Sequence, residues 1–194
     1  MDLDFQRVLK VEHFNAMAWD ELTSKKLALL GEKVLKTIIS NNRVFAIGNG
    51  GSASDAAHFI GEFTSKCKID HKPWKGMCLN SNISTLTAIA NDFSYEEIFS
   101  RQLEAHFQPN DVLIALSTSG TSLNIMKAIS LAVKISPENV FLITSTKSPK
   151  VSNLIESNLI AVPSTITSRI QEIHLFWLHG IIEFCEQRLQ NVSC

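Results

Sequence analysis

The chain has 194 residues, a hydrophobic fraction of 45%, a charged fraction of 19% and a formal net charge of −1. Its length predicts one domain over residues 1–194, and its composition is that of a folded chain and not a disordered one. The balanced charge argues against a nucleic-acid or anionic-membrane surface. We expect a cytoplasmic protein, because no secretory leader and no stretch near the roughly 20 apolar residues of a membrane span is visible.

The first 40 residues predict an N-terminal helical extension. Apolar positions recur at helical spacing from residue 3 to about residue 40. The pattern indicates two helices that meet near Thr23 and Ser24, and either residue can serve as the N-cap of the second. The remainder, about 41–194, is expected to form the sheet core of the same domain.

Short apolar runs alternate with helical patterns through the rest of the chain, ending in a long helix from about Ser168 to Leu189. This alternation predicts an α/β fold, a doubly wound parallel five-stranded sheet flanked by helices. Ligands of such sheets bind beyond the carboxyl ends of the strands. The runs that predict strands are 43–47, 77–79, 111–116, 139–144 and 159–162.

The loop after the run 111–116 is rich in hydroxyls. It comprises Ser117, Thr118, Ser119, Gly120, Thr121 and Ser122 and leads directly into a helical pattern. Exposed N–H groups at a helix N-terminus attract anions, and hydroxyl donors suit a phosphate monoester. The loop matches neither a P-loop nor a dinucleotide fingerprint. It is either a phosphate site or a helix-capping loop without a ligand.

A glycine-rich loop, Gly48–Ser52, follows the run 43–47. Glycines permit positive φ and close backbone approach, and the Asn49 amide can contact a hydroxyl or a carbonyl. A strand-to-helix turn needs the same glycines without any ligand, so this loop alone does not decide between the two readings.

Two helices carry candidate metal ligands. His58 and Glu62 are four residues apart and face one way, which suits a shared divalent metal or an ordinary surface pair. Gln171 and His179 are eight residues apart on the last helix, about 12 Å along its axis, so they hardly reach one ion together. Either the two converge on a pocket wall, or one comes from a neighbouring subunit. A lone histidine in an apolar helix is otherwise usually a core or interface residue.

Taken together, these segments resemble the sugar isomerase (SIS) domain family and, within it, the phosphoheptose isomerases. The resemblance runs in the family's order over nearly the whole chain. One departure is Ser168, which stands where some members have an aspartate, so no role for an acid there is carried over. The segments that carry the resemblance are Gly48–His58 with Glu62, Asn91–Phe93, Phe99–Arg101, Ser117–Gly120 with Ser122, and Arg169–His174.

The resemblance implies a SIS fold and a cytoplasmic homotetramer with sites between subunits. It implies that the enzyme interconverts sedoheptulose 7-phosphate and D-glycero-D-manno-heptose 7-phosphate through an enediol, a step toward nucleotide-activated heptoses of lipopolysaccharide and other glycans. Glu62 is then the base and His179 the acid. The implied zinc ligands are His58, Glu62, Gln171 and His179. The implied substrate contacts are Asn49, Gly50, Gly51, Glu62, Asn91, Asp92, Ser117, Thr118, Ser119, Ser122 and Gln171.

Three other functions stay open on the sequence. One branch of the family is a non-enzymatic tetramer that binds the bacterial replication initiator and lacks the acid/base residues, which are present here. A second possibility is an isomerase of another ketose phosphate, since the loops suit phosphate and hydroxyls better than a given chain length. A third, a sugar-phosphate-sensing regulatory domain, usually comes fused to a DNA-binding module, and none is visible in this sequence.

Overall fold

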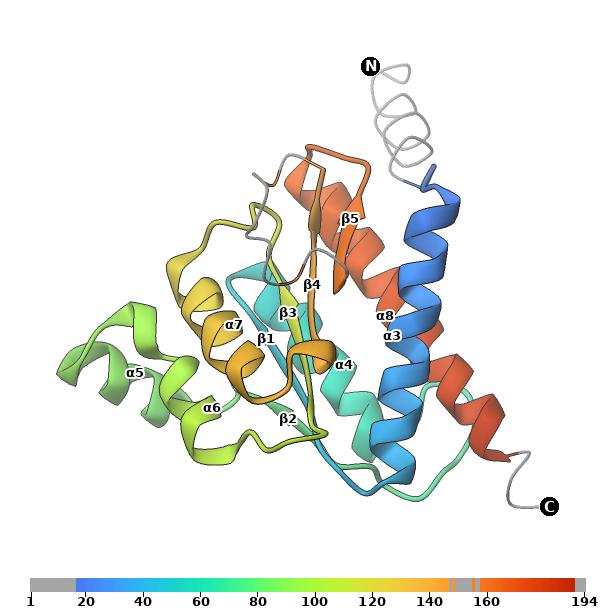
Figure 1. Ribbon diagram of the computed structural model, residues 1–194, viewed down its shortest axis with the longest axis horizontal. Coiled ribbons are helices and arrows are strands. Elements are labelled where there is room, and N and C mark those ends of the chain that lie inside the picture. The colour runs from blue at the N-terminus through green and yellow to red at the C-terminus, as the bar shows by residue number, and fades with distance from the viewer. Residues whose placement is uncertain (1–16, 147, 149–154, 156–157, 191–194) are drawn as a thin grey trace, which may run out of the picture.

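The computed structural model describes residues 17–146, 148, 155 and 158–190 (Figure 1). A five-stranded parallel sheet in the order β2-β1-β3-β4-β5 forms its centre. The predicted doubly wound sheet is therefore confirmed, and each predicted strand is present within one residue of its expected bounds. The strands are Val44–Gly48 (β1), Gly76–Cys78 (β2), Val112–Leu116 (β3), Val140–Ser145 (β4) and Leu159–Val162 (β5).

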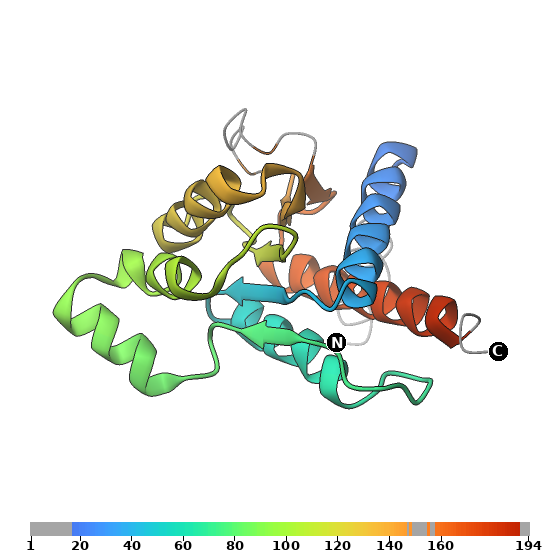
Figure 2. The same ribbon diagram turned by 60° about the horizontal axis from the view of Figure 1, so that its bottom comes forward.

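Helices cover both faces of the sheet (Figures 1 and 2). One face packs against α3, α4 and α8, and the other packs against α6 and α7, with α5 at its margin. None of the helices in the described part of the chain is long and apolar enough to cross a membrane. The helices are α3 (Glu21–Ile39), α4 (Gly51–Thr64), α5 (Ile83–Asp92), α6 (Ser100–His106), α7 (Leu123–Ile135) and α8 (Thr167–Gln190), with 3-10 turns η2 (Tyr95–Glu97) and η3 (Pro137–Asn139).

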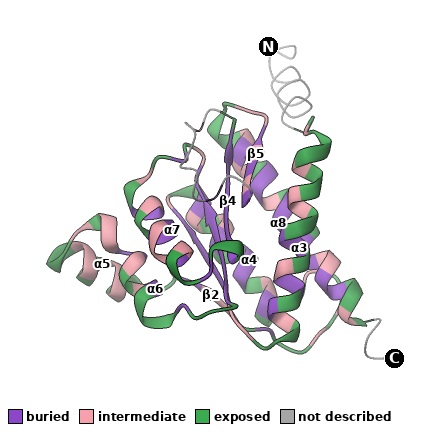
Figure 3. Cartoon of the chain, in the orientation of Figure 1, coloured by how far each residue is buried: buried purple, intermediate pink, exposed green. Residues whose placement is uncertain are grey.

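The strands are apolar throughout because both of their faces are covered. In β1, Val44 and Ala46 point into the core under α3, α4 and α8, whereas Phe45 and Ile47 point into the core under α6 and α7. Side chains of a strand alternate between faces, so a strand buried on both sides reads as a continuous apolar run. Figure 3 shows the resulting buried centre between exposed outer helix faces.

The N-terminal prediction needs one correction. The helix α3 starts at Glu21, and its N-cap is Asp20, whose side chain accepts a hydrogen bond from the Thr23 N–H. Asp20 is therefore the cap, and Thr23 and Ser24 lie inside the first turn. The first of the two predicted helices falls largely on residues 1–16, which lie outside the described residues.

The strand order changes direction between β1 and β3. The chain runs outward from β1 to β2 on one side and from β3 to β5 on the other. The connections that leave β1 and β3 consequently lead in opposite directions, and doubly wound sheets bind their ligands at such a switch point. The Gly48–Ser52 and Ser117–Ser122 loops follow these two strands, as the sequence predicts.

Candidate active site

A cluster of two imidazoles and a carboxylate lies between α4 and α8. His58 Nε2 lies 3.0 Å from His179 Nε2 and 3.4 Å from Glu62 Oε1. The His58 side chain is 47% exposed and the Glu62 side chain 17% exposed, so the cluster faces solvent on one side. The structure thus brings Glu62 and His179 together within one chain, without a second subunit.

The helices themselves create this proximity. His58 and Glu62 are one turn apart on α4, so they share a face. The side chain of Gln171 lies against Gly51, and His179 lies against His58, so α4 and α8 run side by side in the same direction. The separation of eight residues between Gln171 and His179 on α8 is thus nearly equal to the separation of seven residues between Gly51 and His58 on α4. The contact between distant segments is therefore set by how α8 packs on α4.

The donor set suits a zinc ion. Two imidazole nitrogens and one carboxylate oxygen, from His58, Glu62 and His179, all lie within 4.8 Å of one another. Glu62 Oε2 is buried and has no hydrogen-bond partner among the described residues, which leaves one carboxylate oxygen free for a further bond. Two imidazoles on tetrahedral zinc have nitrogens about 3.3 Å apart, close to the spacing seen here. The three residues fit the ion that the sequence implies.

Gln171 lies elsewhere in the same chain. Its amide atoms come within 2.6 to 2.8 Å of the point that a Cβ on Gly51 would occupy. This position is seven residues before His58 on α4, about 10 Å along the helix. The structure does not bring Gln171 to the His58–Glu62–His179 cluster of its own chain, so its metal role stays a prediction that needs a second chain.

Asp55 shares the face of α4 that carries the cluster. It lies three residues before His58 and seven before Glu62, and its Oδ2 is buried without a partner among the described residues. Burial raises the pKa of Asp55 to about 6, and the nearby His58 opposes part of this shift. No role for Asp55 is predicted from the sequence, although its spacing relative to the two predicted ligands is a usable signal.

The Asn49 amide is fixed by two neighbours. Its Nδ2 donates to Asn124 Oδ1 at 2.9 Å, and its Oδ1 accepts from Asn124 Nδ2 at 2.9 Å and from the Tyr95 hydroxyl at 3.0 Å. These bonds join the end of β1 to α7 and η2. The sequence predicts a ligand contact for Asn49 but gives no signal for Asn124 or Tyr95, because all three meet only in the folded chain.

The glycines of the Gly48–Ser52 loop are required for different structural reasons. A Cβ on Gly48 would collide with the backbone of Ser52, so no side chain fits there. Gly50 adopts φ +56, a conformation that favours glycine, and nothing lies within 4 Å of its missing Cβ. Asn80 holds the end of β1 by accepting from the Gly48 N–H and donating to the Gly48 carbonyl. Gly50 therefore leaves its backbone open to an approaching ligand, whereas the Gln171 amide lies against Gly51.

The hydroxyl loop after β3 folds back on itself. Ser117 Oγ accepts from the Gly120 N–H at 3.1 Å, and Ser119 Oγ accepts from Thr121. Thr118 and Ser122 are partly exposed, and the Ser122 side chain does not cap α7. The first N–H groups of α7 thus have no side-chain cap from Ser122. Asn124 Oδ1 accepts from the Ile125 N–H at 2.9 Å, so one N–H group of this helix start is already bonded. The remaining N–H groups of the helix start, beside several hydroxyls, can bind an anion.

Two predicted sugar contacts are not joined to either loop. Asn91 and Asp92 lie at the end of α5, are exposed, and hydrogen bond to each other at 2.8 Å. Among the described residues, no hydrogen bond links them to Asn49 or to the hydroxyl loop. Their predicted contact with substrate therefore stays a prediction.

Comparison with known proteins agrees with this geometry. The profile of the SIS domain family matches residues 16–137. A phosphoheptose isomerase of Shewanella halifaxensis is 40% identical over 171 residues, which is 87% of this chain and 86% of that protein. A phosphoheptose isomerase of Shewanella pealeana is 39% identical over the same shares.

A solved structure of a phosphoheptose isomerase has the same fold as this chain. The phosphoheptose isomerase of Neisseria gonorrhoeae superposes with a TM-score of 0.82 at 28% identity, covering 96% of this chain and all of that one. The chain therefore belongs to the SIS domain family and, within it, to the phosphoheptose isomerases.

Proposed function

We propose that this chain interconverts sedoheptulose 7-phosphate and D-glycero-D-manno-heptose 7-phosphate. The proposal rests on one observation above all, the contact of His58, Glu62 and His179 at the face of α4 and α8. An aldose–ketose isomerisation moves a proton between adjacent carbons and needs a base at carbon and an acid at oxygen. A carboxylate and an imidazole within a few ångströms of each other supply both groups.

Glu62 is the proposed base and His179 the proposed acid. Glu62 Oε2 has no hydrogen-bond partner among the described residues, so no donor competes for this oxygen when the carboxylate acts as a base. His179 Nε2 lies 3.0 Å from His58 Nε2. Because a metal-bound nitrogen carries no proton, the acid role of His179 requires a ring nitrogen that the metal does not bind. The half-buried position of the cluster limits water around the proton that moves.

We propose that His58, Glu62 and His179 hold a zinc ion, and that Gln171 of a neighbouring chain completes the set. A bound zinc ion supplies Lewis-acid polarisation of a carbonyl oxygen. One carboxylate oxygen of Glu62 faces His58 at 3.4 Å and the other is free, so metal binding and proton transfer can use different oxygens.

The hydroxyl loop is the proposed phosphate site, with Ser117, Thr118, Ser119 and Ser122 as donors. Asn49, Gly50, Gly51, Asn91, Asp92 and Gln171 are the proposed sugar contacts. Binding the phosphate far from the reacting carbons holds a flexible sugar in place for proton transfer.

We propose that the chain forms a homotetramer, and the spacing of these parts supports an assembly with sites between subunits. Within one chain, His58 lies about 10 Å down α4 from the carboxyl edge where the phosphate loop sits. An apolar cavity of about 600 Å³ also opens beside His179, with Leu27, Gly31, Phe176 and Phe184 among its lining residues. Phe176 is 52% exposed in the single chain. We propose that neighbouring copies cover this surface and bring a phosphate loop to each cluster, in the cytoplasm.

A panel of phosphorylated ketoses with five to seven carbons, assayed with and without a chelator, tests the proposal. Conversion of the seven-carbon ketose that is lost with chelator and restored by zinc supports it. A preference for a shorter ketose makes the chain an isomerase of another sugar phosphate. No conversion of any ketose by a zinc-loaded tetramer favours the non-enzymatic alternative.

A further inference from the structure

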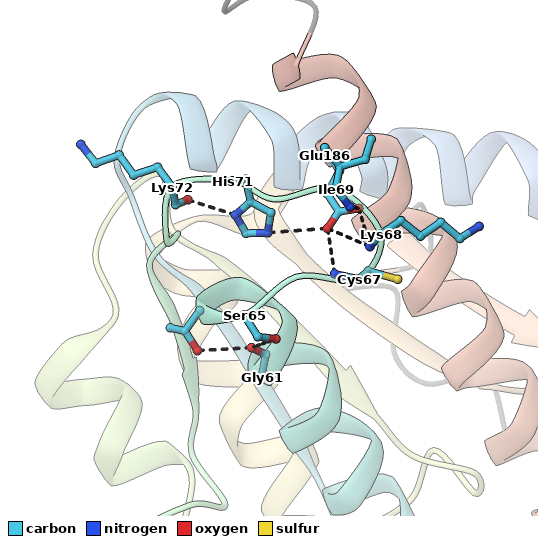
Figure 4. Close-up of polar contacts among 9 residues, drawn as sticks. Gly61, Ser65, Cys67, Lys68, Ile69, His71, Lys72 and Glu186 are labelled. Atoms are coloured by element: carbon cyan, nitrogen blue, oxygen red, sulfur yellow. Dashed lines mark hydrogen bonds and ion pairs between the residues drawn. The ribbon is translucent and has the colours of Figure 1, made fainter.

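Glu186, near the end of α8, is a buried carboxylate that holds a distant loop. It is 1% exposed. Its Oε1 accepts from the Cys67 N–H at 2.8 Å, and its Oε2 accepts from the N–H groups of Lys68 and Ile69, both at 3.0 Å (Figure 4). These three consecutive residues belong to the loop that leaves the C-terminal end of α4.

The backbone amides of residues 67–69 form a specific binding site for the Glu186 carboxylate, and we call this contact the Glu186 anchor. Successive backbone N–H groups that converge on one point bind an anion, and a buried carboxylate needs such donors because its desolvation is costly. The Lys68 ammonium does not share this role, since its Nζ pairs with Glu183 at 2.8 Å on the surface. The nearest ring is His71, with Nε2 3.7 Å from Glu186 Oε1. Glu186 therefore fixes the path of the loop mainly through the backbone.

Aromatic contacts continue from the anchor to the catalytic helix. The His71 ring stacks on Trp74 with centroids 3.7 Å apart, and Trp74 meets Phe63 edge-on at 5.5 Å. Phe63 in turn meets Phe59 at 5.2 Å. All three aromatic side chains are at least nine-tenths buried. A continuous packed path thus joins Glu186 on α8 to the buried face of α4.

Both ends of this packed path lie on the helices that carry the proposed metal ligands. Phe59 directly follows His58 and Phe63 directly follows Glu62, so a shift of the α4 backbone that follows these rings would also move both proposed ligands. Glu186 lies seven residues after His179 on α8, two turns along the same face and about 10 Å away. The anchor therefore connects the two helices whose alignment sets the 3.0 Å contact between His58 and His179.

We propose that Glu186 is a positioning residue for the isomerase cluster: by binding the amides of residues 67–69 it fixes the register of α4 against α8. Buried charges contribute little net stability compared with apolar residues of the same size, so a role in setting one alignment accounts for a charge at this position. This inference rests on the proposed function, because the alignment matters only if the cluster binds metal and substrate.

The test compares the full-length Glu186→Gln variant with Lys68→Gln. The first removes the charge at nearly constant shape, whereas the second removes only the exposed pair with Glu183 and leaves the Glu186 anchor intact. Zinc affinity is measured by competition with a chromophoric chelator, kcat and KM by the isomerase assay, and backbone exchange by mass spectrometry of residues 59–69.

We expect E186Q to weaken zinc binding about tenfold, as when groups that orient a metal's ligands are disturbed. It should lower kcat more than it changes KM and speed exchange of residues 59–69, and K68Q should match wild type in all three. Unchanged zinc affinity and kcat in folded E186Q overturn the proposal. If E186Q does not fold, Glu186→Asp replaces it: weaker zinc binding than in K68Q supports the role, and equal binding overturns it.

Wild-type measurements separate this inference from the proposed function. If wild-type protein neither binds zinc nor isomerises a ketose phosphate, the proposed function fails on its own. The positioning role is then decided by exchange of residues 59–63: faster exchange in E186Q than in K68Q supports it, and equal exchange overturns it.

Discussion

The two halves of the proposed site are built in opposite ways. The His58–Glu62–His179 cluster sits on two long helices whose buried faces determine where the side chains meet. The Ser117–Ser122 loop is held by hydrogen bonds between its own residues and by a glycine, Gly120, at φ +66. Side chains on rigid elements can be exchanged at little cost to the fold, whereas a tight loop depends on its backbone. Substitutions should therefore separate chemistry from stability in the cluster and couple them in the loop.

The strongest test of the cluster is Glu62→Gln. The amide keeps the shape of the side chain but cannot take a proton, so kcat should fall by about 10³-fold or more. Circular dichroism and size-exclusion chromatography should match wild type. Glu96→Gln is the control, because Glu96 pairs with Lys127 at 2.8 Å on the surface, outside the cluster. Turnover of E62Q within tenfold of wild type contradicts the assignment of Glu62 as the base.

The next test probes His174, where α8 passes beneath the end of β4. The side chain is fully buried, and neither ring nitrogen has a hydrogen-bond partner within the described residues. Burial lowers the pKa of His174 to about 4. The neutral ring is therefore favoured in the folded protein, and its stabilising effect is present above pH 6.5 and lost as the pH falls toward 4.

Protonation of His174 should cost roughly 3 kcal/mol of the free energy of unfolding over that range, since one pKa unit corresponds to about 1.4 kcal/mol. Urea unfolding of metal-free protein at pH 7.5 and pH 4.5 measures the loss. His174→Phe should show a smaller loss, because it removes the titrating ring and two unpartnered nitrogens. An equal loss in H174F and wild type assigns the acid sensitivity to other groups.

Some parts of the fold and of the proposed site can be predicted from the sequence and others cannot, for a physical reason. Strands such as 111–116 and the pair His58 and Glu62 follow from local periodicity. The contact of His179 with His58 depends on how α8 packs along α4, which no local pattern encodes. The roles of Tyr95 and Asn124 around Asn49, and of Glu186 around residues 67–69, likewise arise between segments far apart in the chain.

Competition between neighbouring N-cap residues explains why the predicted start of α3 is wrong. Asp20, Thr23 and Ser24 are all good N-cap residues, so the sequence permits three starting points. The Asp20 carboxylate accepts from the Thr23 N–H at 2.7 Å, and burying the apolar face of α3 from Leu27 onward is compatible with the earlier start. The two proposed binding loops, Gly48–Ser52 and Ser117–Ser122, stand out in the sequence because they interrupt apolar runs with residues that turns and ligands require.

On the loop side, Gly120→Ala should couple stability and binding. At φ +66 an alanine is strained by roughly 1 kcal/mol, and its Cβ would collide with Ser148 Oγ. Urea unfolding should show a loss for G120A larger than this strain alone, with an increased KM. A loss of only about 1 kcal/mol would mean that Ser148 moves aside freely.

The smallest and most specific test is Tyr95→Phe. Tyr95 is 60% exposed, so losing its hydroxyl should leave the fold unchanged. That hydroxyl donates to Asn49 Oδ1, and a net hydrogen bond of this kind contributes about 1 kcal/mol. Asn124 still holds the Asn49 amide at both ends, which reduces the effect to about a two- to fivefold rise in KM with kcat unchanged.

The split between KM and kcat makes Y95F informative despite its size. Asn49 belongs to the binding loop and not to the His58–Glu62–His179 cluster, so a change confined to its orientation should alter how tightly substrate binds and leave proton transfer alone. Ser94→Ala, one residue away and without a hydrogen bond from its hydroxyl among the described residues, is the control. A fall in kcat in Y95F would show that the two halves of the site are coupled through η2, and an unchanged KM would show that Asn124 alone orients Asn49.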